Sequence, residues 1–231
     1  MPSNMDSERR LQIAPLERAK QELGGKLPSI IESTTFTLDG LAKTEKGLLV
    51  PVYLANGLGF NEAGRYFIDH EIKPRMEDAG SLVFDPFEQC GEFIQSEVFD
   101  SQQIVESQVE KWKHFNQTVI GIVDYELLIP RSKIMFAIME GYPTDEGVAA
   151  EAAYMATHFG PVIGVRTDFR LAENPATGTN PAVSYFMTKE SFGGGYFEGP
   201  GSYDKAFELL KELCDKEINR HNSTTQTDRL T

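Results

Sequence analysis

The sequence has few cysteines and lacks the short motifs that indicate a metal or a nucleotide phosphate. Cys90 and Cys214 are far apart and have no partners at metal-ligand spacing, a usage typical of a reducing compartment. The four histidines stand singly, without an H-x-x-x-H pair. There is no G-K-S or G-K-T of a phosphate-binding loop, and no G-x-S-x-G of a serine hydrolase. We therefore expect neither a metal nor an organic cofactor.

Positive charge is also scarce, and long apolar runs are missing. Lys and Arg number 22 against 35 Asp and Glu, which gives a net charge of -13. This charge repels a phosphate backbone or an anionic membrane surface, so we expect no nucleic-acid partner. No apolar run approaches the roughly 20 residues that span a bilayer, and the opening "MPSNMDSERR" lacks the apolar region of a signal peptide. The expectation is a cytoplasmic protein without membrane contact.

Apolar segments and helical patterns alternate from residue 48 onward. The apolar segments predict strands at 48–55, 81–87, 133–141 and 161–168, with a short fifth strand at "YFEG". Between and after them, helices are expected at 61–80, 100–117, 124–132, 144–160 and 202–220. Strands separated by helices imply right-handed crossovers and a parallel sheet covered on both faces. The predicted fold is a three-layer α/β/α sandwich with a parallel, doubly wound, flavodoxin-like sheet of about five strands.

The two ends of the chain do not follow this alternation. Residues 1–47 are interpreted as an N-terminal extension with one helix over about residues 7–23. Residues 48–220 form the predicted main domain. The polar segment 221–231, "HNSTTQTDRLT", is expected to be a flexible tail.

Glycine and acidic residues follow the predicted strands, where open α/β sheets bind their ligands. Gly57, Gly59 and Gly64 follow the first strand, but their spacing differs from a dinucleotide fingerprint and favours a tight turn. Asp124, Asp145, Glu151 and Asp168 lie near strand ends or on the flanking helices. The position of these groups makes the carboxylates the main candidates for chemistry.

Glu151 is the most unusual of these carboxylates. It shares a helical stripe with Val148 and Met155 and is surrounded by alanines. An ionised carboxylate on an apolar stripe is costly unless it is hydrogen-bonded or faces a cavity, so an interface salt bridge and a catalytic role in a pocket are the two interpretations. Asp145 and Asp124 have a simpler alternative at helix N-termini, with Thr144 as N-cap in the case of Asp145.

Four segments in order resemble the nucleoside 2-deoxyribosyltransferase family over about residues 49–187. They are "YLANGLGF" (53–60), "DPFEQ" (85–89), "DEGVAAEAAYMA" (145–156) and "GPVIGVRTDFR" (160–170). The resemblance implies that Glu151 is the nucleophile and that Tyr53 orients it. It also implies that Asp145 and Asp124 bind the base or sugar and assist proton transfer. Gln89 and Gly57 would line the substrate site.

The family resemblance also predicts partners and substrates. Asn180 and Ala182, in "NPAV", resemble a segment that completes the site of a neighbouring subunit, so a homo-oligomer, tetramer or hexamer, with shared active sites is expected. The implied substrates are 2-deoxynucleosides and free nucleobases, exchanged through a covalent glycosyl-enzyme. Related deoxynucleoside monophosphate glycosidases carry serine in place of Asp145, so we expect donors without a 5′-phosphate. An N-glycosidase of deoxynucleosides or deoxynucleotides, and a non-catalytic nucleotide-binding module, are the alternatives.

Overall fold

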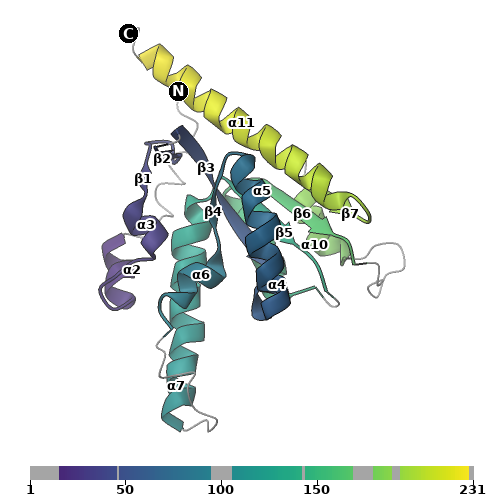
Figure 1. Cartoon of the computed structure of the whole chain (residues 1–231). Coiled ribbons are helices and arrows are strands. Elements are labelled where there is room, and N and C mark those ends of the chain that lie inside the picture. The colour runs from purple at the N-terminus through teal and green to yellow at the C-terminus, as the bar shows by residue number, and fades with distance from the viewer. Residues whose placement is uncertain are drawn as a thin grey trace. The chain divides into compact units, whose positions relative to one another are not determined.

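Figure 1 shows the computed structural model of the whole chain. The chain divides into two compact units. The structure describes residues 16–45, 47–94, 106–141, 144–168, 179–188 and 193–228. A helical unit comprises Met1–Thr34 and Asp85–Arg131, and a sheet unit comprises Thr35–Phe84 and Ser132–Thr231. Within the described residues, every helix is too short or too polar to cross a bilayer.

The sheet unit is built on a mixed, mostly parallel sheet. Its five parallel strands run in the order β4-β3-β5-β6-β7, which is 2-1-3-4-5 when they are numbered along the chain. This order is the flavodoxin-like one, so the predicted fold is confirmed. Two short antiparallel strands, β1 and β2, extend the sheet from the first residues of β3. The strands are β1 Thr35–Phe36, β2 Ala42–Thr44, β3 Gly47–Asn56, β4 Ser81–Phe84, β5 Ile134–Ile138, β6 Val162–Arg166 and β7 Gly195–Glu198.

One face of this sheet carries the main hydrophobic core. Alternate residues of β3, among them Val52 and Leu54, and of β5, among them Phe136, pack there because successive strand side chains point to opposite faces. The covering helices are α4 (Glu62–Phe67), η2 (Ile68–Ile72) and α5 (Lys73–Asp78), which follow one another, and α11 (Ser202–Asp228). Phe136 stacks on Phe207 of α11, which ties this layer to the middle of the sheet.

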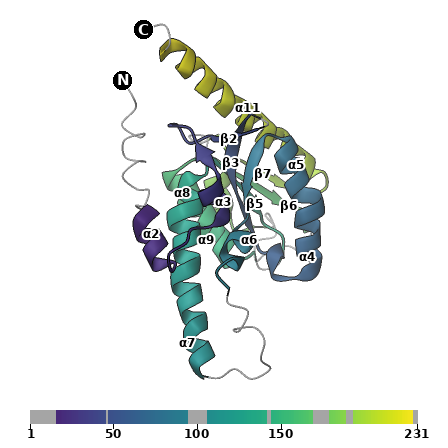
Figure 2. The same ribbon diagram turned by 60° about the vertical axis from the view of Figure 1, so that its left-hand side comes forward.

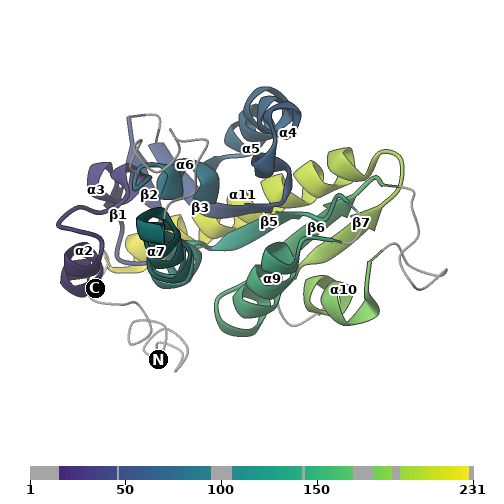
Figure 3. The ribbon, with the colours of Figure 1, turned by 90° about the horizontal axis from the view of Figure 1, so that it is seen from below.

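The other face is covered by α9 (Glu146–His158) and α10 (Pro181–Thr188), as Figure 3 shows. Helix α9 packs on β3, β5 and β6, and α10 packs on β6, β7 and α9. A Cβ at Gly164 of β6 would lie 2.1 Å from Sδ of Met187, so only glycine allows α10 to approach so closely. Helices on both faces complete the three layers, and α10 is additional to the predicted helices.

The helical unit contains one continuous helical run where the sequence predicts two separate helices. The run passes from α7 (Glu106–His114) through the π-helical segments η4 (Phe115–Val119) and η5 (Gly121–Leu128) to α8 (Ile129–Arg131), and Figure 2 shows it without a break. The β-branched residues and Gly121 in "TVIGIV" favour an interruption, but the backbone keeps its hydrogen bonding by widening to π turns. The other helices in the described part of this unit are α2 (Leu16–Glu22), α3 (Ser29–Ser33) and α6 (Pro86–Gly91).

The structure corrects the expectations for both ends of the chain. The supposed N-terminal extension contributes a hairpin, β1 and β2, to the sheet, and the predicted helix at 7–23 is described only from Leu16 as α2. Helix α11 continues to Asp228, so its predicted end at residue 220 is wrong, and most of the segment expected to be a tail is helical. The polar tail contains no Gly or Pro, and the hydroxyls of Ser223 and Thr224 bond carbonyls one turn earlier.

Candidate active site at the end of strand β3

The strand order creates a switch point between β3 and β5. After β3 the chain enters η1 (Leu58–Phe60) and α4 on one face, whereas after β5 it enters α9 on the opposite face. The carboxyl ends of these neighbouring strands are the place where open α/β sheets bind ligands. The segments that begin at Asn56 and at Met139 therefore border the candidate site.

Tyr53 and Glu151 are in contact three residues before the end of β3. Tyr53 lies in β3 with a fully buried side chain on the face that α9 covers. Its hydroxyl donates a hydrogen bond to Oε1 of Glu151 at 2.9 Å. Glu151 is half-buried, and the neighbouring Ala152 is buried. The tyrosine hydroxyl therefore orients the carboxylate. The residues on either side of Glu151 in α9 are alanines.

Asp145 and Gly57 are in contact where β3 ends and α9 begins. Asp145, and not Thr144, is the N-cap of α9, with Oδ1 accepting the N–H of Val148 at 3.0 Å. A Cβ placed on Gly57 would lie 3.0 Å from Cβ of Asp145, which is tighter than an ordinary contact. Glycine at position 57 thus lets the turn after β3 approach the capping carboxylate. The contacts of Tyr53 and Gly57 together hold β3 and the turn after it against α9 at two positions, Glu151 and the N-cap Asp145.

The ends of β5 and β6 are joined by a carboxylate that sequence reasoning did not single out. Glu140 accepts the N–H of Thr167 at 2.7 Å, the Thr167 hydroxyl at 2.6 Å and the N–H of Asp168 at 2.9 Å. Tyr203 of α11 also donates to Glu140 at 3.4 Å, and burial together with this nearby negative charge raises the pKa of Tyr203. The only sequence signal for this junction is polar residues directly after two apolar strands.

Asp124 and Gln89 belong to the helical unit, where both are buried. Asp124 is 4% exposed in the π-helical segment η5, and its Oδ1 accepts from Sγ of Cys90 on α6 at 3.6 Å. Gln89 is 6% exposed, and its Oε1 accepts the N–H of Ile30 at 3.3 Å. A buried carboxyl in a π turn is a common setting for a functional group. That either residue acts with Glu151 stays a prediction.

Asn180 and Ala182 lie at the start of α10 in the sheet unit. Both are exposed, and the side-chain oxygen of Asn180 accepts the N–H of Ala182 at 2.9 Å, so Asn180 caps the helix. The preceding Thr179 is buried, and its hydroxyl lies 2.7 Å from the hydroxyl of Tyr196 in β7. Strand β7 therefore fixes the start of α10. That Asn180 and Ala182 contact a neighbouring subunit stays a prediction.

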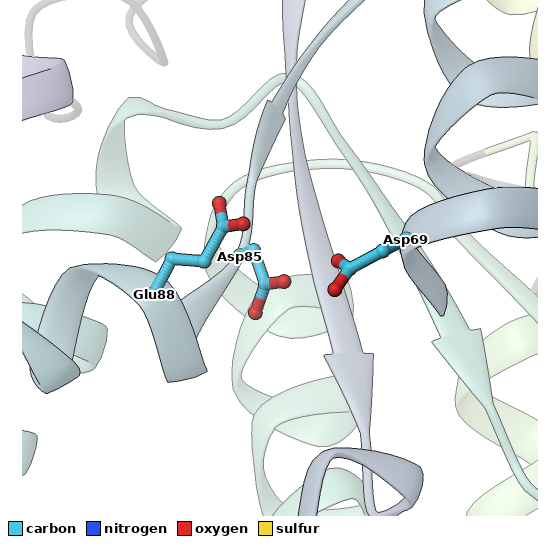
Figure 4. Close-up of side chains that lie close together, drawn as sticks. All are labelled: Asp69, Asp85 and Glu88. Atoms are coloured by element: carbon cyan, nitrogen blue, oxygen red, sulfur yellow. The ribbon is translucent and has the colours of Figure 1, made fainter. Parts of the chain in front are cut away.

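The three acidic side chains in Figure 4 belong to two different units of the chain. Asp69 belongs to η2 of the sheet unit, whereas Asp85 and Glu88 belong to the start of α6 in the helical unit. Asp85 has a local function, because its Oδ1 accepts the N–H of Phe87 at 3.0 Å and caps α6. Acidic groups near a helix N-terminus are favoured by the helix dipole alone.

Comparisons with known proteins add little to this geometry. No protein-family model matches the chain, and no curated protein matches it. Among solved structures, the chain is similar to a conserved protein from Enterococcus faecalis V583, with 16% sequence identity and a TM-score of 0.46. The alignment covers 71% of this chain and 99% of that protein. Likeness at this level says nothing about activity.

Proposed function

We propose that the protein transfers a 2-deoxyribosyl group between nucleobases through a covalent glycosyl-enzyme on Glu151. The observation that carries the proposal is the 2.9 Å hydrogen bond from Tyr53 to a half-buried Glu151 beside the switch point of the sheet. A carboxylate oriented by a hydrogen bond, near the strand ends where open α/β sheets bind ligands, can attack a sugar carbon. The family resemblance of the surrounding segments assigns the same roles to these two residues.

The reaction needs two displacements at C1′ of the sugar. In the first, the C1′–N bond breaks through an oxocarbenium-like state while an oxygen of Glu151 forms a bond to C1′, and the departing base accepts a proton. In the second, a nitrogen of another base attacks C1′ from the vacated side, the ester bond to Glu151 breaks, and that base loses a proton. Two inversions restore the original configuration. The protein's role is to hold the carboxylate, supply the proton and exclude water.

A second carboxyl group is assigned as the acid that protonates the departing base. The resemblance favours Asp124 and, after it, Asp145. Asparagine also caps helices well, so Asp145→Asn keeps the start of α9 and removes only the acid. We expect the true acid's Asn variant to slow donors with poor leaving bases much more than donors with activated ones. Comparing Asp124→Asn with Asp145→Asn on both kinds of donor identifies which carboxyl group is the acid.

The proposed substrates are uncharged at the sugar, and the proposed setting is the cytoplasm. The net charge of -13 disfavours donors that carry a 5′-phosphate. Both cysteines are free and buried, which fits a reducing compartment. Free 2-deoxynucleosides as donors and free nucleobases as acceptors follow from the same resemblance.

Replacing Glu151 by alanine tests the proposal directly. The assay incubates the protein with deoxyinosine and free adenine and resolves the products by chromatography. We expect Glu151→Ala to lower the rate by at least about a thousandfold, each tenfold being about 1.4 kcal/mol of barrier, because no covalent intermediate can form. Mass spectrometry of the wild-type protein with donor alone should show an added deoxyribosyl group that the variant lacks.

The matched control is Glu146→Ala, which removes an exposed carboxylate from the first turn of the same helix. It should keep nearly the wild-type rate. A Glu151→Ala protein that retained more than about a tenth of that rate would contradict the role of nucleophile. If deoxyinosine yields free hypoxanthine at the same rate with and without adenine, the protein is an N-glycosidase instead.

A further inference from the structure

Arg166, the last residue of β6, is a fully buried cation beside the candidate site. Its Nη1 donates to the backbone oxygens of Met139 at 3.0 Å and Gly141 at 2.9 Å. The same nitrogen lies 3.5 Å from the hydroxyl oxygen of Thr144, and Nε lies 3.9 Å from a carboxylate oxygen of Glu198. Burying a guanidinium is costly unless hydrogen bonds and a counter-charge compensate, so this arrangement has a specific use.

The backbone groups that Arg166 binds belong to the connection between β5 and α9. The ladder between β5 and β6 ends with Ile138 and Val165, after which the N–H of Met139 still bonds Val165. Gly141 then turns the chain with a φ of 99°, a conformation that favours glycine. Beyond the ladder, carbonyls have no strand to bond, and the guanidinium supplies the missing donors.

This connection leads directly into the residues of the proposed reaction. Thr144 precedes Asp145, the N-cap of α9, and Glu151 lies farther along the same helix. A helix moves as a rigid body over so short a length. A shift of the connection therefore changes the position of Glu151 relative to the Tyr53 hydroxyl.

We infer that Arg166 is a positioning residue, which fixes the β5–α9 connection and thereby the capping Asp145 and the nucleophile Glu151. The inference rests on the proposed function for its catalytic part. Arginine suits the task because Nη1 bonds two carbonyl oxygens of the connection while Nε of the same planar group faces Glu198. Lysine presents a single ammonium group on a flexible stem and cannot reproduce that geometry.

The test is Arg166→Lys, which keeps the charge next to Glu198 and changes the geometry. A misplacement of about 1 Å can cost about a hundredfold in rate, so we expect kcat to fall at least about tenfold. KM for deoxyinosine should change less than kcat, because the substrate's own binding groups remain. The control is Arg75→Lys, an exposed arginine on α5 that bonds Asp204, and it should leave both constants unchanged.

A second readout needs no activity. The amide of Val148 donates to Asp145, so its hydrogen exchange in the free, full-length protein reports whether the start of α9 is held. We expect this amide to exchange at least about tenfold faster in Arg166→Lys, while amides in β3 and β5 stay protected as evidence that the fold is intact.

The two readouts separate the failure of this inference from the failure of the proposed function. A wild-type kcat in Arg166→Lys would overturn the inference and leave the transferase proposal standing. An equal fall of kcat in Arg166→Lys and in the Arg75→Lys control would do the same. If the wild-type protein neither transfers nor hydrolyses any deoxynucleoside, the proposed function fails. A faster Val148 amide would then show Arg166 as a structural tie without a role in catalysis, which also overturns the inference.

Discussion

Tyr53 supplies both a buried ring and a hydrogen-bond donor, and a one-atom substitution separates the two. In Tyr53→Phe the ring still fills its place in the core, while Glu151 loses the hydroxyl that orients it. We expect the free energy of unfolding to change by only about 1 kcal/mol and kcat to fall about 10- to 100-fold. Urea denaturation and the transfer assay measure the two effects.

The control for this substitution is Tyr66→Phe, which removes a hydroxyl from a tyrosine that is 65% exposed. It should change neither stability nor rate. If Tyr53→Phe turned over donors like the wild-type protein, the hydrogen bond to Glu151 would be a packing feature only.

Asp145 allows a test of the donor class at the same scale. Serine caps helices well, so Asp145→Ser keeps the start of α9 while it removes one negative charge next to Gly57. We expect the wild-type protein to prefer deoxyinosine over its 5′-monophosphate, because the carboxylate repels the phosphate, and the variant to show a smaller preference. Glu146→Ser, an exposed neighbour, should not alter the preference.

The ratio of the two kcat/KM values decides the matter. Equal or better turnover of the monophosphate by the wild-type protein would remove the role given to Asp145 and favour a monophosphate N-glycosidase.

Some of these residues could be recognised in the sequence because their signals are local. Glu151 interrupts an apolar stripe, Tyr53 lies in an apolar strand, and Asp145 stands where helix N-caps stand. Arg166 carries no such signal, because its partners are backbone carbonyls of a connection that only the folded sheet brings near. The same holds for Glu140, whose partners follow another strand.

At the scale of elements, a hydrogen bond between His221 and Asp39 ties the C-terminal half of α11 to the β1–β2 hairpin. Nδ1 of His221 lies 2.8 Å from Oδ1 of Asp39, which also accepts the Thr37 hydroxyl at 2.6 Å. Partial burial would raise the pKa of Asp39, but the hydrogen bonds of Thr37 and His221 outweigh it, so the pKa is below its ordinary value of 3.8. The contact explains why a polar helix end stays ordered against the sheet unit.

The lowered pKa of Asp39 determines how stability should depend on pH. The carboxylate contributes stability above pH 3.8 and loses it as pH falls through the still lower pKa of the folded protein. We expect Asp39→Asn to lower the free energy of unfolding at neutral pH and to have a smaller effect under strongly acidic conditions. Urea denaturation at about pH 6 and about pH 3 measures the difference, and a difference that did not shrink would contradict the assignment.

The sequence predicted the elements with strong periodicity and missed those whose signals are short. Four of the five parallel strands are where the apolar runs predict them, because buried parallel strands are apolar throughout. The fifth, β7, is only partly buried and overlaps the short strand expected at "YFEG". The hairpin has an Asp39-Gly40 turn, with a φ of 85° at Gly40, but only two and three residues per strand. Helix α10 has only eight residues, and a Cβ at Gly164 would meet Met187 of this helix.

For the whole molecule, the main prediction is an oligomer whose active sites combine residues of two subunits. Glu151→Ala and Asn180→Ala should each be nearly inactive, but co-expression should restore activity. In a random mixture about a quarter of the sites receive Glu151 from one subunit and Asn180 from another, so about a quarter of the wild-type rate is expected. Light scattering of the wild-type protein gives the number of subunits.

Melting temperatures of the two variants serve as the control, since Asn180 also caps α10. A co-expressed mixture no more active than the average of the two variants would mean that each site is complete within one chain.

The two units are interleaved along the chain, and this has a consequence for biosynthesis. Helices α2 and α3 leave the ribosome before their partners, because α2 packs on η5 and Ser29 of α3 bonds Glu92, both of which come later in the chain. Likewise β3 acquires its neighbour β5 only when residue 138 has emerged. Neither unit can therefore be completed before residue 131 has emerged. We expect nascent chains that stop before that residue to remain open to proteases and chaperones, and protection to arise abruptly once it has passed.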